Sequence, residues 1–403
     1  MTSRAPETTM RLRLEPWGAW ARLESMPALI ALDRDGVRAL GVDGESAWQA
    51  KPSVSMPLEV HLAVTSKCAA GCEGCYLDAR ADGEHVPFDR LETTMREIAA
   101  AGVFTVAFGG GEPTTREDIG ELGELARSLG LVPVLTTSGL GLSAAKVERL
   151  RAFAQVNVSY DGAAAEYERV RGFDGAGQAE RSIEALAAAG IPVGVNVVLT
   201  RDTFDALGAT LLRARSLGAG EAQLLRYKPQ GRARSLDYLA RRLTREQRLA
   251  FPSVLRHASE ALRPLEFRIR IDCALVPFLS TDPEIYAHPE LLAKFGVLGC
   301  EAGGALTAVR VDGKLAPCSF ADAAKADGDS LRAAYGRDAD LARFRDFSAT
   351  APEPCASCAI RTVCKGGCKI VSQYAGSFGA DPECPRVELS RADNRPSEAL
   401  LPA

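Results

Sequence analysis

The sequence lacks any long apolar run. No segment of its 403 residues approaches the ~18 consecutive apolar residues that a membrane-spanning helix needs. The N-terminal stretch MTSRAPETTMRLRLEPW also lacks the continuous apolar core of a secretory signal peptide. We therefore expect a cytoplasmic protein that has no membrane partner.

Charge of one sign is not in excess either. The chain has 48 Lys and Arg against 52 Asp and Glu, a net charge of −4. No overall basic field therefore favours nucleic acid or an anionic membrane as a partner. An arginine-rich stretch at 226–242 is local, and we interpret it first as a solvated surface and second as a site for an acidic partner.

Cysteine is absent from residues 76–272, although the chain has 11 cysteines. Three of them lie within residues 68–75, and the others lie within 273–384. Disulfides are uncommon in the cytoplasm, so this distribution predicts metal or redox chemistry at two places in the chain.

The central part of the sequence alternates short apolar, β-branched runs with amphipathic segments. The expected strands are 58–64, 103–108, 131–137, 155–160, 191–199 and 221–227. The expected helices lie near 88–101, 116–129, 143–153, 177–189 and 203–217. This alternation predicts an α/β fold with a parallel sheet, either doubly wound or curled into a partial (β/α)6 barrel. In both architectures the chemistry gathers at the carboxyl ends of the strands.

Four parts of the chain differ in character. Residues 1–57 alternate apolar and polar positions and contain the turn signal Asp35-Gly36, which predicts a small β-hairpin extension. The predicted barrel covers 58–232. Residues 233–299 are charged and helix-like, with a short strand at 267–271, and we interpret them as a bridge. Cysteine and glycine dominate from 300 to 384, so residues 300–403 form the fourth part.

The first cysteines, Cys68, Cys72 and Cys75, follow the first predicted strand directly. Three thiolates on a tight loop can ligate three irons of a four-iron cluster and leave the fourth iron open. An open position is typical of a catalytic metal site rather than a structural one. The alternatives are a three-cysteine zinc site completed by His61 or His85, and reactive thiols without a metal.

The segment after the second predicted strand extends this pattern. It reads Gly109-Gly110-Gly111-Glu112-Pro113. The loop Cys68-x3-Cys72-x2-Cys75-Tyr76 together with this GGGEP segment resembles the radical S-adenosylmethionine superfamily. The resemblance implies a [4Fe-4S] cluster whose open iron is chelated by the methionine end of S-adenosylmethionine. One electron then splits this cosubstrate, and the resulting 5′-deoxyadenosyl radical abstracts hydrogen from an unactivated C–H bond.

The same resemblance implies which residues contact S-adenosylmethionine. Gly109, Gly110 and Gly111 let the backbone approach the methionyl ammonium, and Glu112 is a further acceptor. Ser138 stands where the family usually has an asparagine. The other expected contacts are Ser159 and Asp161 in the SYDG segment, Asn196 on the fifth strand, and Tyr76 against the adenine. For each strand-end residue, ordinary turn structure is the alternative.

A second cysteine array lies near the C-terminus. Its spacing is Cys300-x12-Gly313-x4-Cys318, then Cys355-x2-Cys358-x5-Cys364-x3-Cys368, then Cys384. This array resembles the SPASM extension of radical S-adenosylmethionine enzymes, which carries two auxiliary iron–sulfur clusters. By that resemblance, Cys355, Cys358, Cys364 and Cys384 hold one cluster, and Cys300, Cys318 and Cys368 supply three ligands to the other. A zinc ribbon is the alternative for this part.

Cys273 is the one cysteine that neither array uses. It either completes the second auxiliary cluster or stays a free thiol close to an open iron. A free thiol there donates hydrogen to a substrate radical in one interpretation and is an inert buried residue in another.

Enzymes with this extension act mostly on peptides and proteins. The resemblance therefore implies a maturase that crosslinks, oxidises or epimerises a ribosomally made precursor peptide, with an external donor similar to flavodoxin or ferredoxin. Residues 1–57 are too short for a winged-helix leader-binding domain, so we expect a separate recognition protein or direct docking of the precursor. The alternatives are a formylglycine-generating sulfatase maturase, an enzyme acting on a small cofactor precursor, and an electron-transfer protein without radical chemistry.

Overall fold

The computed structural model describes residues 10–23, 29–42, 54–234, 237–323 and 330–393. A nine-stranded sheet forms its centre, with the order β10-β9-β8-β7-β6-β5-β4-β11-β12. The strands are β4 (Glu59–Thr65), β5 (Thr105–Gly110), β6 (Val132–Thr137), β7 (Gln155–Ser159), β8 (Val193–Leu199), β9 (Glu221–Arg226), β10 (Arg268–Ile271), β11 (Leu306–Val309) and β12 (Leu315–Ala316). All pairs are parallel except β11 with β12. The six predicted strands are confirmed as β4–β9.

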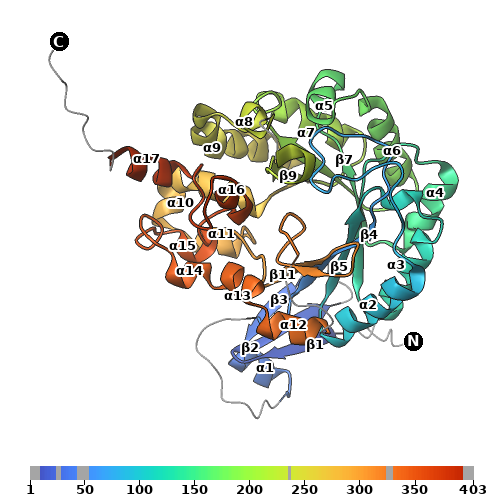
Figure 1. Cartoon of the computed structure of the whole chain (residues 1–403), viewed down its shortest axis with the longest axis horizontal. Helices are drawn as coiled ribbons and strands as arrows, with labels where there is room; N and C mark the ends of the chain where they lie inside the picture. Colours follow the sequence, from blue (N-terminus) through green and yellow to red (C-terminus); the bar gives the residue numbers. More distant parts are fainter. Residues whose placement is uncertain (1–9, 24–28, 43–53, 235–236, 324–329, 394–403) are drawn as a thin grey trace, which may run out of the picture.

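Helices on the outside of the sheet connect these strands (Figure 1). They are α2 (Phe88–Ala100), α3 (Ile119–Ser128), α4 (Ala144–Arg149), α5 (Ala164–Arg171), α6 (Ala176–Ala188) and α7 (Leu207–Ser216). In α2, Leu91, Met95 and Ile98 are buried, and this spacing puts one apolar face of the helix on the sheet. The five predicted crossover helices are confirmed, and α5 is an additional helix after β7.

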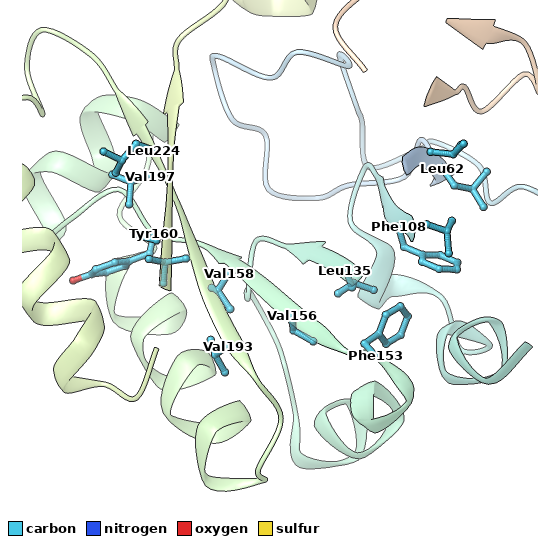
Figure 2. Packing of buried hydrophobic residues seen from close by; sticks show 14 of the residues in the cluster. Leu62, Phe108, Leu135, Phe153, Val156, Val158, Tyr160, Val193, Val197 and Leu224 are labelled. Carbon is cyan, nitrogen blue, oxygen red and sulfur yellow. The ribbon is translucent and has the colours of Figure 1, made fainter. Parts of the chain in front are cut away.

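The sheet curls into an incomplete barrel. Along β4, the buried residues Val60, Leu62 and Val64 face the helices, and Figure 2 shows Leu62 in that core. The alternate residues face the other side, and Glu59 there interacts electrostatically with Arg270 in β10. In sheet order β5–β9 lie between these two strands. A flat sheet would hold β4 and β10 far apart. The curvature of the sheet therefore brings these two strands toward each other.

The apolar core lies between the strands and their helices. Figure 2 shows Phe108, Leu135 and Phe153 packed there, and the rings of Phe108 and Phe153 meet edge to face with centroids 5.4 Å apart. This core fixes where the strands end, and therefore where the loops that follow them converge.

The predicted bridge also contributes to the sheet. The strand expected at 267–271 is β10, and it extends the sheet beyond β9. The other main elements of the bridge are α8 (Asp237–Arg241), α9 (Arg245–Leu262), a 3-10 segment (Cys273–Thr281), α10 (Pro283–Ala287) and α11 (Glu290–Lys294). At the opposite edge, β11 from the cysteine-rich part pairs with β4. The two later parts of the chain therefore extend both edges of the barrel, and the predicted domain boundaries stay a prediction.

The N-terminal part is a three-stranded antiparallel sheet followed by one short helix. The elements are β1 (Met10–Glu15), β2 (Gly18–Leu23), β3 (Leu29–Asp33) and α1 (Arg34–Ala39). Hairpin pairing is confirmed, but the turn predicted at Asp35-Gly36 is wrong. Asp33 caps α1 by accepting a hydrogen bond from the Gly36 backbone at 2.8 Å. Asp35 and Gly36 therefore lie in the first turn of a helix.

Two arginines attach this N-terminal sheet to the barrel. Arg13 donates to the carbonyl oxygens of Pro57 at 2.8 Å and Gly102 at 3.1 Å, and Arg11 donates to that of Gly130 at 2.8 Å. Gly102 and Gly130 follow the ends of α2 and α3, where guanidinium groups favour the exposed helix carbonyls. The N-terminal sheet therefore lies at the amino ends of the barrel strands, away from the cysteine loop.

Short helices make up most of the C-terminal part. They are α12 (Leu331–Arg337), α13 (Ala339–Arg345), α14 (Phe347–Thr350), α15 (Arg361–Cys364), α16 (Lys369–Tyr374) and α17 (Pro385–Asp393). Figure 1 shows most of these helices on the opposite side of the central strands from α3 and α4. Within the described ranges, no helix combines the length and the apolar character that crossing a membrane requires.

Candidate active site

The three cysteines of the first loop lie at the carboxyl end of β4. The Cys68 backbone N–H donates to the Arg80 carbonyl at 2.7 Å, and that of Cys75 donates to the Cys72 carbonyl at 3.3 Å. Burial raises the pKa of the Cys68 thiol, and the neighbouring charges of Glu112, Cys72 and Cys75 raise it further. The thiols are therefore close enough to repel one another as thiolates, an arrangement that a cationic metal centre would stabilise.

The segment after β9 holds this loop in place. The Arg232 side chain donates two hydrogen bonds to the Cys72 carbonyl, at 2.7 and 2.9 Å, and its backbone N–H donates to the Cys75 carbonyl at 2.9 Å. Gly231 has φ +60°, and a Cβ there would lie 2.4 Å from the Cys75 carbonyl oxygen. No pattern in the sequence indicates these roles, apart from the position of both residues after the sixth predicted strand.

Replacing Gly231 with alanine should displace the cysteine loop. The added Cβ would meet backbone rather than a flexible side chain, so the loop itself must move. We expect the variant to lose about four irons per chain after anaerobic reconstitution, the content of one cubane cluster. Iron and sulfide analysis measures this directly.

Gly296→Ala is the matched control. Gly296 also has a left-handed φ, +70°, but a Cβ there has no atom within 4 Å. It therefore carries the same backbone strain, about 1 kcal/mol, without the collision. Equal iron contents in the two variants would contradict the role of Gly231.

The three glycines after β5 have different surroundings. A Cβ at Gly110, with φ +115°, would lie 2.3 Å from the Thr65 carbonyl oxygen, and one at Gly111 would lie 2.3 Å from that of Lys67. These two glycines let the strand ends approach each other. A Cβ at Gly109 has no atom within 4 Å, so this residue borders open space in which a ligand can approach the backbone.

The Glu112 carboxylate is fully engaged by the chain. It accepts hydrogen bonds from the Thr114 backbone and hydroxyl at 3.1 and 2.7 Å and from the Thr137 hydroxyl at 2.7 Å. The Ser138 backbone and hydroxyl donate to its second oxygen at 2.7 and 2.6 Å. Five donors occupy the roughly four lone-pair positions of a carboxylate. In this structure Glu112 therefore joins the loops after β5 and β6, and its predicted contact with S-adenosylmethionine stays a prediction.

In the SYDG segment, some polar side chains are likewise engaged by the chain and others remain candidates for ligand contact. Ser159 ends β7 and is the register partner of Asn196 in the middle of β8, so the two residues lie side by side. Asp161 is buried and accepts from the Arg171 side chain at 2.6 Å and from the Val198 backbone at 2.7 Å. The position of Asp161 thus supports a structural role, whereas Ser159 and Asn196 remain candidates for ligand contact.

Arg171 is a residue that the sequence did not indicate. It lies at the end of α5, and its guanidinium interacts electrostatically with Asp161 and with Cys72 of the first loop. Within the described part of the chain, only its Nε makes a hydrogen bond. The remaining nitrogens can bind an anionic group beside the loop.

Tyr76 links the first loop to the C-terminal part. Its ring lies against Phe320 with centroids 4.5 Å apart, and the ammonium of Lys228 lies 4.2 Å from the Phe320 ring. Phe320 is two residues beyond Cys318. The first loop and one part of the second cysteine array therefore approach each other.

The second array separates into two groups. In the first, Cys273 interacts electrostatically with Cys300 and Cys368. Burial, together with the charges of Cys300 and Cys368, raises the pKa of Cys318 to about 12. The structure thus places Cys273 near Cys300 and Cys368, and these two also interact with Cys318, the third cysteine of the group that the resemblance implies.

The second group lines one cavity. Cys355, Cys358, Cys364 and Cys384 line one shared pocket. These are the four cysteines that the resemblance assigned to one cluster, and all 11 cysteines of the chain are free thiols. Four thiols around one pocket are a donor set that fits a cubane cluster.

The two histidines of the zinc alternative have other partners. His61 is bonded through Nδ1 to the Ser319 hydroxyl at 2.6 Å and through Nε2 to Glu59 at 2.8 Å. His85 Nδ1 is bonded to the Thr65 hydroxyl at 2.8 Å. In the ranges that the structure describes, no three His, Cys, Asp or Glu side chains are placed to hold a single metal ion. A four-iron cluster has a different requirement, because each iron takes its own thiolate.

Comparison with known proteins agrees with this geometry. The family model described as the Radical SAM superfamily matches residues 62–214. The "PqqA peptide cyclase" of Methylobacterium nodulans is 28% identical over 349 residues, which cover 83% of this chain and 87% of that protein. The "Mycofactocin maturase MftC" of Mycolicibacterium smegmatis is 25% identical over 371 residues, covering 87% of this chain and 89% of that protein.

Solved structures share the fold. Streptococcus suis SuiB bound to S-adenosylmethionine has a TM-score of 0.72 at 17% identity, covering 93% of this chain and 98% of that one. The structure titled "Native anSMEcpe with bound AdoMet and Cp18Cys peptide" has a TM-score of 0.62 at 19% identity, covering 83% and 98%. Residues 62–214 thus form a Radical SAM domain, and the chain that carries this domain is an enzyme.

Proposed function

We propose that this enzyme cleaves S-adenosylmethionine reductively and modifies a ribosomally made precursor peptide. The observation that carries the proposal is the three-thiol loop after β4, which lies beside the open space at Gly109 after β5. Relatives named as a peptide cyclase and a maturase support a peptide substrate. The name cyclase favours crosslink formation among the reactions that the sequence suggested.

In this proposal Cys68, Cys72 and Cys75 hold the first [4Fe-4S] cluster. When bound, the cluster and S-adenosylmethionine supply hydrogen abstraction from an unactivated C–H bond. Arg232 and Gly231 keep the loop in position for it.

Residues around the loop would bind S-adenosylmethionine. Arg171 offers a cation for the methionine carboxylate, and Gly109 leaves room for the ammonium. Ser159 and Asn196 contact the ribose, and Tyr76 packs near the adenine. Glu112, Ser138 and Asp161 act through the shape of the surrounding loops.

We further propose that the second array holds two auxiliary clusters. Cys355, Cys358, Cys364 and Cys384 hold one in their shared cavity. Cys300, Cys318, Cys368 and Cys273 hold the other, with Cys273 as the fourth ligand. Such clusters give an exit for the electron that a net oxidation of the substrate leaves behind.

The Cys273→Ala variant tests the fourth-ligand assignment. Because Cys273 lies beside Cys300 and Cys368, we expect the variant to lose up to about four irons or to show an altered signal of one auxiliary cluster. Iron analysis and electron paramagnetic resonance of the reduced protein measure both. Unchanged iron and spectra together with lost activity would instead identify a free thiol that serves the substrate.

Partners follow from the same proposal. The precursor peptide is the substrate, and a donor similar to flavodoxin or ferredoxin supplies electrons. The structure titled "Streptococcus suis SuiB bound to precursor peptide SuiA" shows that a protein of this fold binds such a peptide. The N-terminal sheet lies at the far end of the barrel from the cysteine loop, so we expect the leader either to dock elsewhere or to be presented by a separate recognition protein.

Anaerobic reconstitution with candidate precursor peptides tests the function. We expect 5′-deoxyadenosine and a peptide product lighter by two hydrogen atoms, detected by mass spectrometry. Deuterium uptake without a mass loss would indicate epimerisation. Production of 5′-deoxyadenosine with every peptide left unchanged would contradict the proposed substrate class.

A further inference from the structure

Lys369 is a buried cation that the proposed chemistry does not use. It begins α16, directly after Cys368, and is only 1% exposed. Its Nζ donates to the carbonyl oxygens of Lys365 at 3.0 Å and Gly367 at 3.3 Å, and it lies 3.4 Å from the centre of the Phe347 ring. In the described residues, no carboxylate forms an ion pair with it.

The other buried cations nearby are paired. Arg226 contacts Asp381 at 2.5 Å and Glu383 at 2.8 Å, and Lys228 contacts Asp272. A buried ammonium without a counter-charge is strongly unfavourable. Lys369 therefore needs negative charge from a source other than a carboxylate partner.

Cysteines from both auxiliary groups supply that charge. Burial lowers the pKa of Lys369, and the charges of Cys300 and Cys368 of the first group and of Cys364 of the second oppose this shift. Asp381 acts on it as well but is already paired with Arg226. Gly366, with φ +77°, makes room for the ammonium, because a Cβ there would lie 2.9 Å from Nζ. The Nζ of Lys369 donates to the carbonyl of Lys365, which follows Cys364, and to that of Gly367, which precedes Cys368. The chain thus places one buried amine between two sets of thiols.

We propose that Lys369 is the shared counter-charge of the two auxiliary cluster sites and raises the reduction potential of both. The inference rests on the proposed function, because it requires clusters at these cysteines. A reduced cluster carries one more negative charge than an oxidised one, so a nearby ammonium in a medium of low dielectric favours the reduced form. Net charge and hydrogen bonding around a cluster are known to set its potential.

The test compares Lys369→Met with Lys294→Met in the full reconstituted chain. Lys294 ends α11 and is exposed, so water screens its charge and it is a suitable control. We expect Lys369→Met to retain about twelve irons per chain, as three cubane clusters require. Both auxiliary potentials should move to more negative values in a redox titration followed by electron paramagnetic resonance. The potential of the first cluster in Lys369→Met, and all potentials of Lys294→Met, should match those of the wild type.

Lys369→Gln is the second variant in case the methionine disturbs folding. Unchanged auxiliary potentials with full iron content would overturn the inference, and a shift confined to one cluster would overturn the shared role. Loss of auxiliary iron in both variants would show that Lys369 serves assembly instead. A wild-type chain with only about four irons would refute the auxiliary sites themselves, which separates that failure from the failure of this inference.

Discussion

Removing all three thiols of the first loop, by Cys68→Ala, Cys72→Ala and Cys75→Ala together, should reduce 5′-deoxyadenosine production to background. Without these ligands the loop holds no iron, so no electron reaches S-adenosylmethionine. We expect a loss of about four of twelve irons per chain. Chromatography of the reaction after dithionite reduction measures the nucleoside, and iron analysis measures the loss.

The second array serves as the internal control for this variant. Its cysteines lie on separate segments and do not depend on the first loop for their ligands. The variant should therefore keep the auxiliary signals in electron paramagnetic resonance. Continued nucleoside production above background would show that the reaction does not occur at Cys68, Cys72 and Cys75.

Replacing Arg226 with methionine should have the largest effect on stability. Arg226 ends β9, its side chain is 3% exposed, and it pairs with Asp381 and Glu383 of the C-terminal part. Removing one partner of a buried ion pair leaves uncompensated charge and costs about 3–5 kcal/mol. We expect this loss in the free energy of unfolding, measured by urea denaturation of the reconstituted protein.

The effect should extend to the auxiliary site. Asp381 also accepts a hydrogen bond from the Cys368 backbone at 3.0 Å, so its displacement moves a proposed ligand. Arg96→Met is the control, because Arg96 pairs with Glu92 on an exposed helix face at 2.7 Å. That surface pair contributes less than about 1 kcal/mol. A loss of similar size in both variants would show that the buried network does not join barrel and C-terminal part.

The barrel could be predicted from sequence because its strands are long and apolar. β4–β9 are buried on their helix-facing side, and each appears in the sequence as a short run rich in apolar residues. By contrast, β10 is four residues of alternating arginine and isoleucine, and its place in the sheet depends on its pairing with β9. The missed helix α5 buries only Tyr167 and Val170, so its pattern is weak. At Asp35-Gly36 the local turn signal was overridden by the Asp33 cap.

The candidate active site also contains residues that the sequence could predict and residues that it could not. The first array could be predicted because its ligands lie close together on one loop. The second lies on separate segments, and its cysteine spacing was identified through the resemblance to a known motif. Arg171, Arg232 and Lys369 carry no such spacing, and their roles come from contacts between segments far apart in the chain. Glu112 was identified, but the sequence could not show that five donors of its own chain surround its carboxylate.

The most direct test of the account is to add S-adenosylmethionine to the anaerobically reduced protein and record the electron paramagnetic resonance of the first cluster. An open iron at Cys68, Cys72 and Cys75 predicts that the signal changes on addition. The same addition should leave the spectrum of the triple cysteine variant unchanged. A wild-type spectrum that is indifferent to S-adenosylmethionine, in a protein with its full iron content, would contradict the account.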